Sequence, residues 1–437
     1  MYRTLFLTII LVLAVLTPLS TGAASVVLTG GVGAPVPVEP ERQSGLDAVW
    51  VVNSGGSEPL KAVYTPTVAG AAVTWSRFSN LGGGYAEPVA GAAGYELDGL
   101  MPDMGYIVTE GNRRYCFWVT DYASKPFELH GITTGDSDCN DITLLVDGTG
   151  ARMTYTGING RAVEIDREIT VSYTFPVYDE ASGGYVASEV ARNFSYLHNE
   201  MHLDAPLADT RYTVAGDRFL RQWGGVQSLT GPDVVAVAVS ATVTATQGQR
   251  ADVDNEQKDD NIGTLGGSAP VEVSFAAAVT DAVVFTEWQM ASDPDFDIID
   301  LRFTDTGFDY VFTESGTTFV RFVCANADGS CTYTSETFTV EVGMSDLRCP
   351  NAFSPGGSPG VNDEWRVSYK SIISFDCHIF TRSGREVAHL TDPSQGWDGR
   401  IGSKPAPVGV YYYVIKAEGA DGRKYNLSGD INIVGYR

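Results

Sequence analysis

Apolar and polar residues alternate with a period of two in many short segments of this chain. Residues 168–175 alternate over their whole length, and residues 72–78 place Val73 and Trp75 on one side of an extended segment. A period of two is the pattern of a β-strand that buries one face. No segment demands a helix of ordinary length, so an all-β fold is predicted. Further strands are expected at residues 47–52, 106–109, 115–119, 234–239, 271–275, 284–289 and 338–342.

The predicted strands fall into groups, and a chain of 437 residues is long enough for several domains in series. We expect tandem immunoglobulin-like β-sandwich domains with a small C-terminal β-sandwich domain. A charged segment without apolar periodicity separates the second and third groups and is interpreted as a linker or an exposed loop. The expected organisation is a signal peptide at 1–24, an immunoglobulin-like β domain at 25–147, a second β-sandwich at 148–246, an acidic linker at 247–267, a third β domain at 268–345 and the C-terminal domain at 346–437.

The N-terminus has the layout of a secretory signal peptide. Arg3 precedes an apolar run from Leu5 to Leu16, and small residues follow up to a cleavage position after Ala24. The run is shorter than the ~20 apolar residues that span a bilayer. No later stretch is long and apolar enough to replace it, so no transmembrane segment is expected after signal cleavage.

The chain is strongly acidic, with 29 Lys and Arg against 54 Asp and Glu and a net charge of −25. Nucleic acid is excluded as a partner, because binding a phosphate backbone requires basic surfaces. Self-repulsion of this size suits a secreted protein that must stay soluble.

Six cysteines form three pairs that are local in the sequence. An even number of cysteines in an exported protein favours structural disulfides over metal or redox sites. The second pair brackets an Asp328-Gly329 turn, and a hairpin there would place its two cysteines on facing strands. The predicted disulfide residues are Cys116 with Cys139, Cys324 with Cys331, and Cys349 with Cys377.

The third β domain resembles a known family. A strand containing Trp288 is followed by Gly316-Thr317-Thr318-Phe319-Val320 and by a final strand at 338–342. This order resembles a PKD-type immunoglobulin-like domain. The resemblance implies a spacer or a binding module on a surface protein.

From Cys349 to the C-terminus, turn motifs and aromatic strands alternate. This segment resembles the gliding motility-associated C-terminal domain of Bacteroidetes, a sorting domain read by the type IX secretion system. It departs from the family at Gly356 to Gly360, where an Asn- and Asp-rich stretch is usual, and at Ser383, where Trp is usual. The sorting-motif residues that carry the resemblance are Pro350, Asn351, Phe353, Pro355, Asn362, Asp363, Trp365, Arg382, Gly384, Trp397, Asp398, Gly399, Gly409, Tyr411 and Tyr413.

The resemblance implies a route and a destination. Export would proceed by Sec to the periplasm and then by the type IX secretion translocon to the cell surface or the medium. The translocon and an outer-membrane partner are the implied partners.

No catalytic, cofactor-binding or metal-binding residue is predicted. Asp252, Asp254 and Glu256 begin like a calcium loop, but Gln257 occupies the position where an EF-hand needs glycine. His198 and His202 do not have the His-Glu-x-x-His order of zinc proteases. The acidic loops are therefore interpreted as solvated, and no cofactor is expected.

The favoured function is that of a non-enzymatic secreted or cell-surface protein with an adhesin-like role toward a glycan or protein ligand. One alternative is a secreted hydrolase, for example a glycan-active enzyme, whose two carboxylates face each other across a cleft. Another is a structural component of the cell-surface or motility apparatus.

Overall fold

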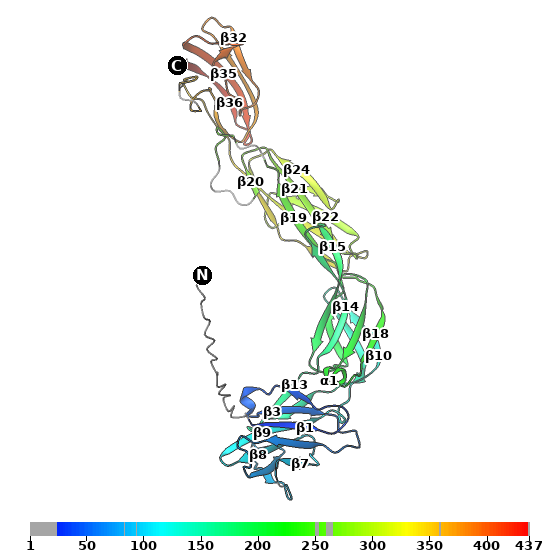
Figure 1. Cartoon of the computed structure of the whole chain (residues 1–437). Helices are drawn as coiled ribbons and strands as arrows, with labels where there is room; N and C mark the ends of the chain where they lie inside the picture. The colour runs from blue at the N-terminus through cyan, green and yellow to red at the C-terminus, as the bar shows by residue number, and fades with distance from the viewer. Residues whose placement is uncertain are drawn as a thin grey trace, which may run out of the picture.

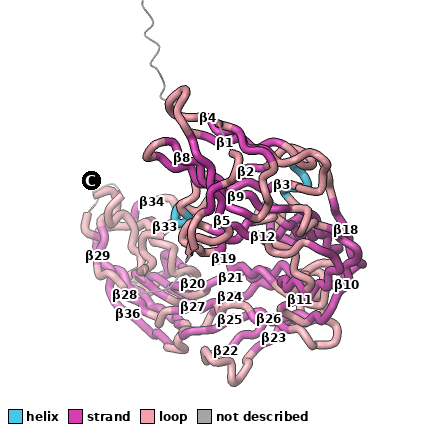
Figure 2. The backbone as a smooth tube through the Cα atoms, turned by 90° about the horizontal axis from the view of Figure 1, so that it is seen from below, coloured by secondary structure: helices cyan, strands magenta, loops and turns pink. Residues whose placement is uncertain are grey.

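The computed structural model describes residues 24–82, 84–92, 94–249, 253–258, 265–357 and 360–435. These residues form four β units in a curved row, with the first and fourth units at opposite ends (Figure 1). Helix is confined in the described residues to two short segments, the 3-10 turn η1 (Arg42–Ser44) and α1 (Arg218–Gln222), as Figure 2 shows. The predicted all-β fold of tandem sandwiches is confirmed. Apart from Ala24, the predicted signal peptide lies outside the described residues.

Unit 1 (residues 25–121) pairs a three-stranded sheet, β1-β4-β7, with a six-stranded sheet, β2-β3-β9-β8-β5-β6. The β8–β9 hairpin turns after Glu110, and Trp75 of β5 packs edge-on against Phe117 in the core. The strands are β1 (Ser25–Thr29), β2 (Val36–Val38), β3 (Ala48–Val52), β4 (Lys61–Thr65), β5 (Val73–Phe78), β6 (Glu87–Pro88), β7 (Glu96–Asp98), β8 (Met104–Glu110) and β9 (Arg113–Asp121).

Unit 2 (residues 128–234) combines the sheets β10-β11-β16 and β15-β14-β17-β18 with the separate hairpin β12–β13. Its strands are β10 (Glu128–Ser137), β11 (Asp141–Thr149), β12 (Met153–Thr156), β13 (Ala162–Ile165), β14 (Ile169–Asp179), β15 (Gly184–Phe194), β16 (Glu200–Asp204), β17 (Thr210–Gly216) and β18 (Gln227–Val234). The expected boundary at 147/148 falls inside β11. Because β11 pairs with both β10 and β16, residues from 128 onward belong to unit 2 rather than to unit 1.

Unit 3 (residues 241–342) packs the sheet β19-β21-β24 against β20-β27-β25-β22-β23, with β26 paired to β25. Its strands are β19 (Ala241–Gln247), β20 (Leu265–Gly267), β21 (Val271–Val279), β22 (Phe285–Ala291), β23 (Leu301–Phe303), β24 (Gly307–Phe312), β25 (Gly316–Ala325), β26 (Thr332–Thr334) and β27 (Phe338–Val342). The expected linker at 247–267 is not a connection between units. It begins in β19 and ends in β20, so it is an excursion from within unit 3.

Unit 4 (residues 346–433) is built on the five-stranded sheet β29-β36-β35-β31-β32, with the pairs β28–β30 and β33–β34 beside it. Its strands are β28 (Asp346–Arg348), β29 (Ala352–Phe353), β30 (Ser368–Lys370), β31 (Ile372–Phe380), β32 (Glu386–Leu390), β33 (Arg400–Ile401), β34 (Lys404–Pro405), β35 (Gly409–Gly419) and β36 (Lys424–Ile433). Across the described ranges of the chain, no helix has the length and apolar character needed to cross a membrane.

Candidate sorting domain and the junctions that carry it

The aromatic residues of the sorting motif form the core of unit 4. Trp365 and Trp397 pair through their backbones, and the indole of Trp365 donates a 2.7 Å hydrogen bond to the carbonyl of Pro350. The Trp397 ring packs against Phe353 and Tyr411 at centroid distances of 5.5 and 5.0 Å. These four rings are buried, so a partner that meets the folded domain cannot touch them. These four aromatic residues hold the loops of unit 4 onto its five-stranded sheet.

The polar and glycine residues of the motif shape the turns of unit 4. The Asp363 carboxylate accepts hydrogen bonds from the backbone amides of Gly356 and Gly360 at 2.9 and 2.6 Å. Gly399 has a φ of +71°, and a Cβ there would lie 2.8 Å from Pro355. Arg382 is exposed at the turn between β31 and β32. Recognition of any of these residues by a translocon stays a prediction.

The predicted disulfide pairing is wrong. The structure joins Cys139 to Cys331, and the other cysteines, Cys116, Cys324, Cys349 and Cys377, are free. Cys139 lies in the β10–β11 turn of unit 2 and Cys331 in the β25–β26 turn of unit 3. The bond therefore connects two units rather than closing two local loops.

Strand geometry explains why the local pairs do not form. Cys324 points into the core of unit 3 with Phe322, and its partner across the hairpin is Tyr333 rather than Cys331. Cys116 is buried in the apolar core that units 1 and 2 share, whereas Cys139 lies in the β10–β11 turn. Burial raises the pKa of the Cys116 and Cys324 thiols to about 11, which keeps them protonated and unreactive at neutral pH.

The third expected pair is also free, although both cysteines lie in unit 4. Cys377 is fully buried on β31, and burial raises the pKa of its thiol to about 12. Cys349 is half-buried before β29 and interacts with the hydroxyl of Tyr413. This domain is therefore held by its aromatic core and not by a disulfide.

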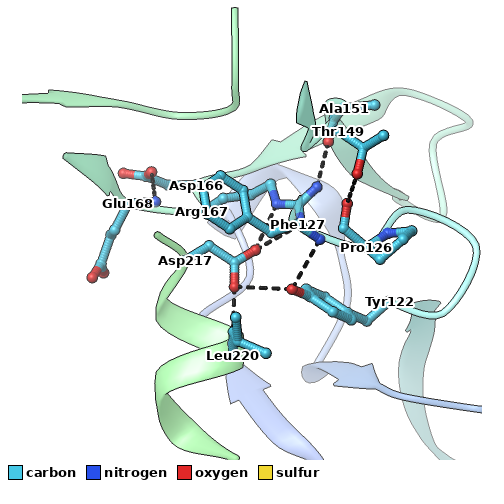
Figure 3. A network of polar contacts seen from close by, with 10 residues as sticks. All are labelled: Tyr122, Pro126, Phe127, Thr149, Ala151, Asp166, Arg167, Glu168, Asp217 and Leu220. Atoms are coloured by element: carbon cyan, nitrogen blue, oxygen red, sulfur yellow. Dashed lines mark hydrogen bonds and ion pairs between the residues drawn. The ribbon is translucent and has the colours of Figure 1, made fainter. Parts of the chain in front are cut away.

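A fully buried ion pair inside unit 2 is the centre of a polar network that reaches Tyr122 at the end of unit 1 (Figure 3). Arg167 donates to the Asp217 carboxylate through Nε at 2.8 Å, and both side chains are 0% exposed. Asp217 also caps α1 by accepting from the Leu220 amide at 2.8 Å, and it receives a 3.3 Å hydrogen bond from the Tyr122 hydroxyl. Tyr122 directly follows β9 of unit 1, so the network ties the end of unit 1 to the interior of unit 2.

Units 1 and 2 also share one apolar core. It includes Val49 and Trp118 of unit 1 together with Ile142 and Val214 of unit 2. The β12–β13 hairpin lies between them, and the Tyr155 hydroxyl accepts a 2.7 Å hydrogen bond from the Glu41 amide. The first two units therefore form a single packed body.

Residues 253–258, which we call the strap, reach from unit 3 onto unit 4. The Asn255 side-chain amide donates to the carbonyls of Val367 and Pro393, both at 2.8 Å. The Gln257 amide donates to the Tyr369 carbonyl at 2.7 Å, so the strap runs beside β30 as an extra bridged segment. The strap therefore couples the candidate sorting domain to the unit before it.

A second set of contacts supports this coupling. The Ser371 amide donates to Ser268 Oγ at 2.7 Å, and the Ser315 amide donates to the Ala420 carbonyl at 3.0 Å. Ala420 of unit 4 is buried in the core cluster of unit 3. Unit 4 is thus docked on unit 3 both by hydrogen bonds and by the apolar packing of Ala420.

The acidic residues and histidines lie at different places in the fold, and a further acidic loop begins at Asp293. Asp293 accepts from the Asp295 amide at 2.9 Å and stabilises a turn. Glu256 lies in the strap, and Asp252 is outside the described residues. His198 stacks on Tyr196, whereas His202 contacts Thr143, so the two histidines do not form one site.

A hollow of about 1000 Å³ in unit 1 contains two carboxylates, Glu110 and Asp47. Glu110 accepts four hydrogen bonds, including those from the amides of Thr67 and Val68 at 3.0 Å. The Thr67 amide is the largest cause that lowers the pKa of Glu110 to about 2. Asp47 accepts from the Cys116 amide at 2.7 Å. Both carboxylates therefore brace loops and strands.

Two parts of the chain match known families. Residues 347–433 match the family described as the CHU_C type IX secretion signal domain, and residues 131–231 match the fibronectin type III domain family. The predicted C-terminal sorting domain and the upstream immunoglobulin-like fold are thereby confirmed. No curated protein matches the sequence significantly.

Several solved structures are similar over much of the chain. A tetra-tandem repeat in the extending region of a large adhesion protein is 13% identical and covers 86% of this chain and 96% of its own, with a TM-score of 0.20. Sidekick-1 immunoglobulin domains 1–5 are 11% identical over 85% of this chain and 75% of theirs, with a TM-score of 0.25. Dimeric latent PorU from Porphyromonas gingivalis is 10% identical over 73% of this chain and 35% of its own, with a TM-score of 0.17. At these scores none of the three bears on function.

Proposed function

We propose that this chain is a non-enzymatic, β-modular surface or secreted protein with an adhesin-like role. It is exported by Sec and then by the type IX secretion system through unit 4. The observation that carries the proposal is the secretion signal match at 347–433, which lies at one end of the row of units. If unit 4 is held at the cell surface, unit 1 is the part that meets other surfaces first.

The exposed apolar residues of unit 1 support contact with a ligand there. Tyr85 is 84% exposed, and Val68 and Met101 are 64% and 50% exposed. Exposing an aromatic ring to water is unfavourable, and burying the ring against a binding partner regains that free energy. We therefore propose Tyr85 as a contact residue for a glycan or protein ligand.

Export is tested by transferring units 3 and 4 together to a periplasmic reporter. Residues 241–437 keep the strap and the Ser268–Ser371 contacts, whereas residues 241–343 lack unit 4. In cells with a type IX secretion system, the longer fusion should reach the surface and the shorter one should stay in the periplasm. Equal surface delivery of both fusions would refute the sorting role.

Adhesion is tested on the full chain with arrays of glycans and surface proteins. Tyr85→Ala should weaken binding to the captured ligand, whereas Tyr412→Ala, on the exposed face of unit 4, should not. Hydrolysis products in place of stable binding would refute the adhesin-like role and support the hydrolase alternative.

A further inference from the structure

Two histidines and two carboxylates gather on the outer face of unit 4, at the edge of its five-stranded sheet. His378 of β31 and His389 of the edge strand β32 are directly paired in the ladder. Their rings are stacked with centroids 4.1 Å apart and an interplanar angle of 7°. Asp376 lies two residues before His378 on the same face of β31, and Glu386 lies on β32.

Three donor atoms converge in this group. Oδ1 of Asp376 is 2.6 Å from Nε2 of His389 and 3.3 Å from Nε2 of His378. The possible ligand atoms of these three residues all lie within 4.8 Å of one another. In a tetrahedral zinc site with bonds of ~2.0–2.2 Å, neighbouring ligand atoms are roughly 3.3 Å apart. The spacing of the donor atoms fits one ion, and the two rings must rotate out of their parallel stack for both nitrogen lone pairs to point at it.

The second ring nitrogen of His378 provides an independent observation. Its Nδ1 atom is buried and has no hydrogen-bond partner, and Oε1 of Glu386 lies 3.4 Å away. A histidine that ligates a metal through one nitrogen usually donates its other N–H to a carboxylate, which fixes the ring. A reorientation of the Glu386 carboxylate, which is already within reach of Nδ1, would let it accept that hydrogen bond.

We propose that Asp376, His378 and His389 bind one Zn²⁺ ion, with Glu386 as a positioning residue for His378. Two imidazoles and a carboxylate suit Zn²⁺ better than Ca²⁺ or Mg²⁺, which prefer all-oxygen sites. The ion would hold the edge strand β32 to β31 and leave a fourth position for water. Zinc would thus be a structural ligand of the domain that carries the secretion signal match.

Lys416 of β35 opposes this binding. It is paired with Asp376 across the β31–β35 ladder, and side chains directly opposite in a ladder lie ~4.5–5.5 Å apart at Cβ. Its positive charge should weaken cation affinity without contributing a ligand.

Calorimetric titration of the purified full chain with ZnCl₂ tests the proposal. One equivalent of Zn²⁺ should bind, and His378→Ala and His389→Ala should each weaken binding by on the order of 100-fold or more. Glu386→Gln should weaken Zn²⁺ binding by about 10–100-fold, which is the usual effect of changing a residue that hydrogen-bonds a zinc ligand. His130→Ala and His202→Ala, which change histidines of unit 2, should leave the isotherm unchanged.

Lys416→Gln separates zinc binding from a folding defect, because it should tighten Zn²⁺ binding several-fold while leaving every ligand in place. Zinc should also raise the melting temperature of the wild-type chain and not that of His389→Ala. Absence of binding in the wild-type chain, or an isotherm that survives the combined His378→Ala and His389→Ala change, would overturn the proposal.

Discussion

The junction between units 1 and 2 and the junction between units 2 and 3 hold neighbouring β units together by different means. The first buries a continuous apolar core and the Arg167–Asp217 ion pair. The second has polar contacts, such as the 2.9 Å hydrogen bond between Tyr185 and Thr242, and the disulfide between Cys139 and Cys331. The first junction is therefore part of the folded core of units 1 and 2. The disulfide of the second junction forms only in an oxidising compartment.

The difference suits a protein that is exported before it works. A junction made by core packing forms as soon as its two units fold. A junction closed by a disulfide is completed only where thiols are oxidised, as in the periplasm or outside the cell. Units 1 and 2 are then expected to behave as one cooperative body, and unit 3 as a body joined to it by a covalent tie.

Removing one partner of the buried ion pair should have the largest effect. Arg167→Ala leaves Asp217 charged and buried, and such changes typically cost about 3–5 kcal/mol of unfolding free energy. Urea unfolding followed by intrinsic fluorescence measures the loss. The matched control is Arg211→Ala, which breaks an ion pair with Asp233 that is exposed on both sides and should cost ~0–1 kcal/mol. Equal costs for the two variants would contradict the special role of the first junction.

Breaking the disulfide should change orientation more than the folding of any one unit. In Cys139→Ser with Cys331→Ser, the polar contacts remain but the tie across 192 residues is lost. Spin-label distance distributions between units 2 and 3 should broaden, while those between units 1 and 2 stay narrow. Reducing agent should reproduce the effect in the wild-type chain, because the four other cysteines are already thiols. Unchanged distances in both cases would show that the polar contacts alone fix this junction.

The strap provides a smaller effect at the third junction. Asn255→Ala removes two hydrogen bonds and leaves the carbonyls of Val367 and Pro393 without that donor, at a cost of about 1–3 kcal/mol in strap docking. Proteolysis within the strap should become faster, and amide exchange at Tyr369 should rise. The exposed Asp254→Ala serves as the control and should change neither rate.

The strands could be predicted from the sequence because their evidence is local. The alternation over residues 168–175 corresponds to β14, and the strands expected at 106–109 and 115–119 correspond to the β8–β9 hairpin. The sorting-motif aromatics were also predictable, since their order along the chain is that of the family.

The junctions could not be predicted, because their evidence is not local. Cys139 and Cys331 are separated by 192 residues, and only the packing of two units brings them together. Asn255 lies in a charged stretch without periodicity, and its contacts depend on the position of unit 4. The contact between His378 and His389 could not be predicted either, because it depends on the register of β31 and β32.

Acid titration sharpens the comparison, because unit 1 contains a buried carboxylate, Glu110, whose pKa is lowered. The pKa of Glu110 is lowered from its ordinary value of 4.5 to about 2, chiefly by the Thr67 amide. A lowered pKa means that its stabilisation is complete above pH 4.5 and is lost as the pH falls toward 2. Glu110→Gln has no such charge, so the difference in melting temperature between wild type and variant should shrink over that window. If units 1 and 2 are one cooperative body, their shared transition should shift while that of unit 3 does not. A shift in a transition of unit 1 alone would show that the shared core does not couple the two units.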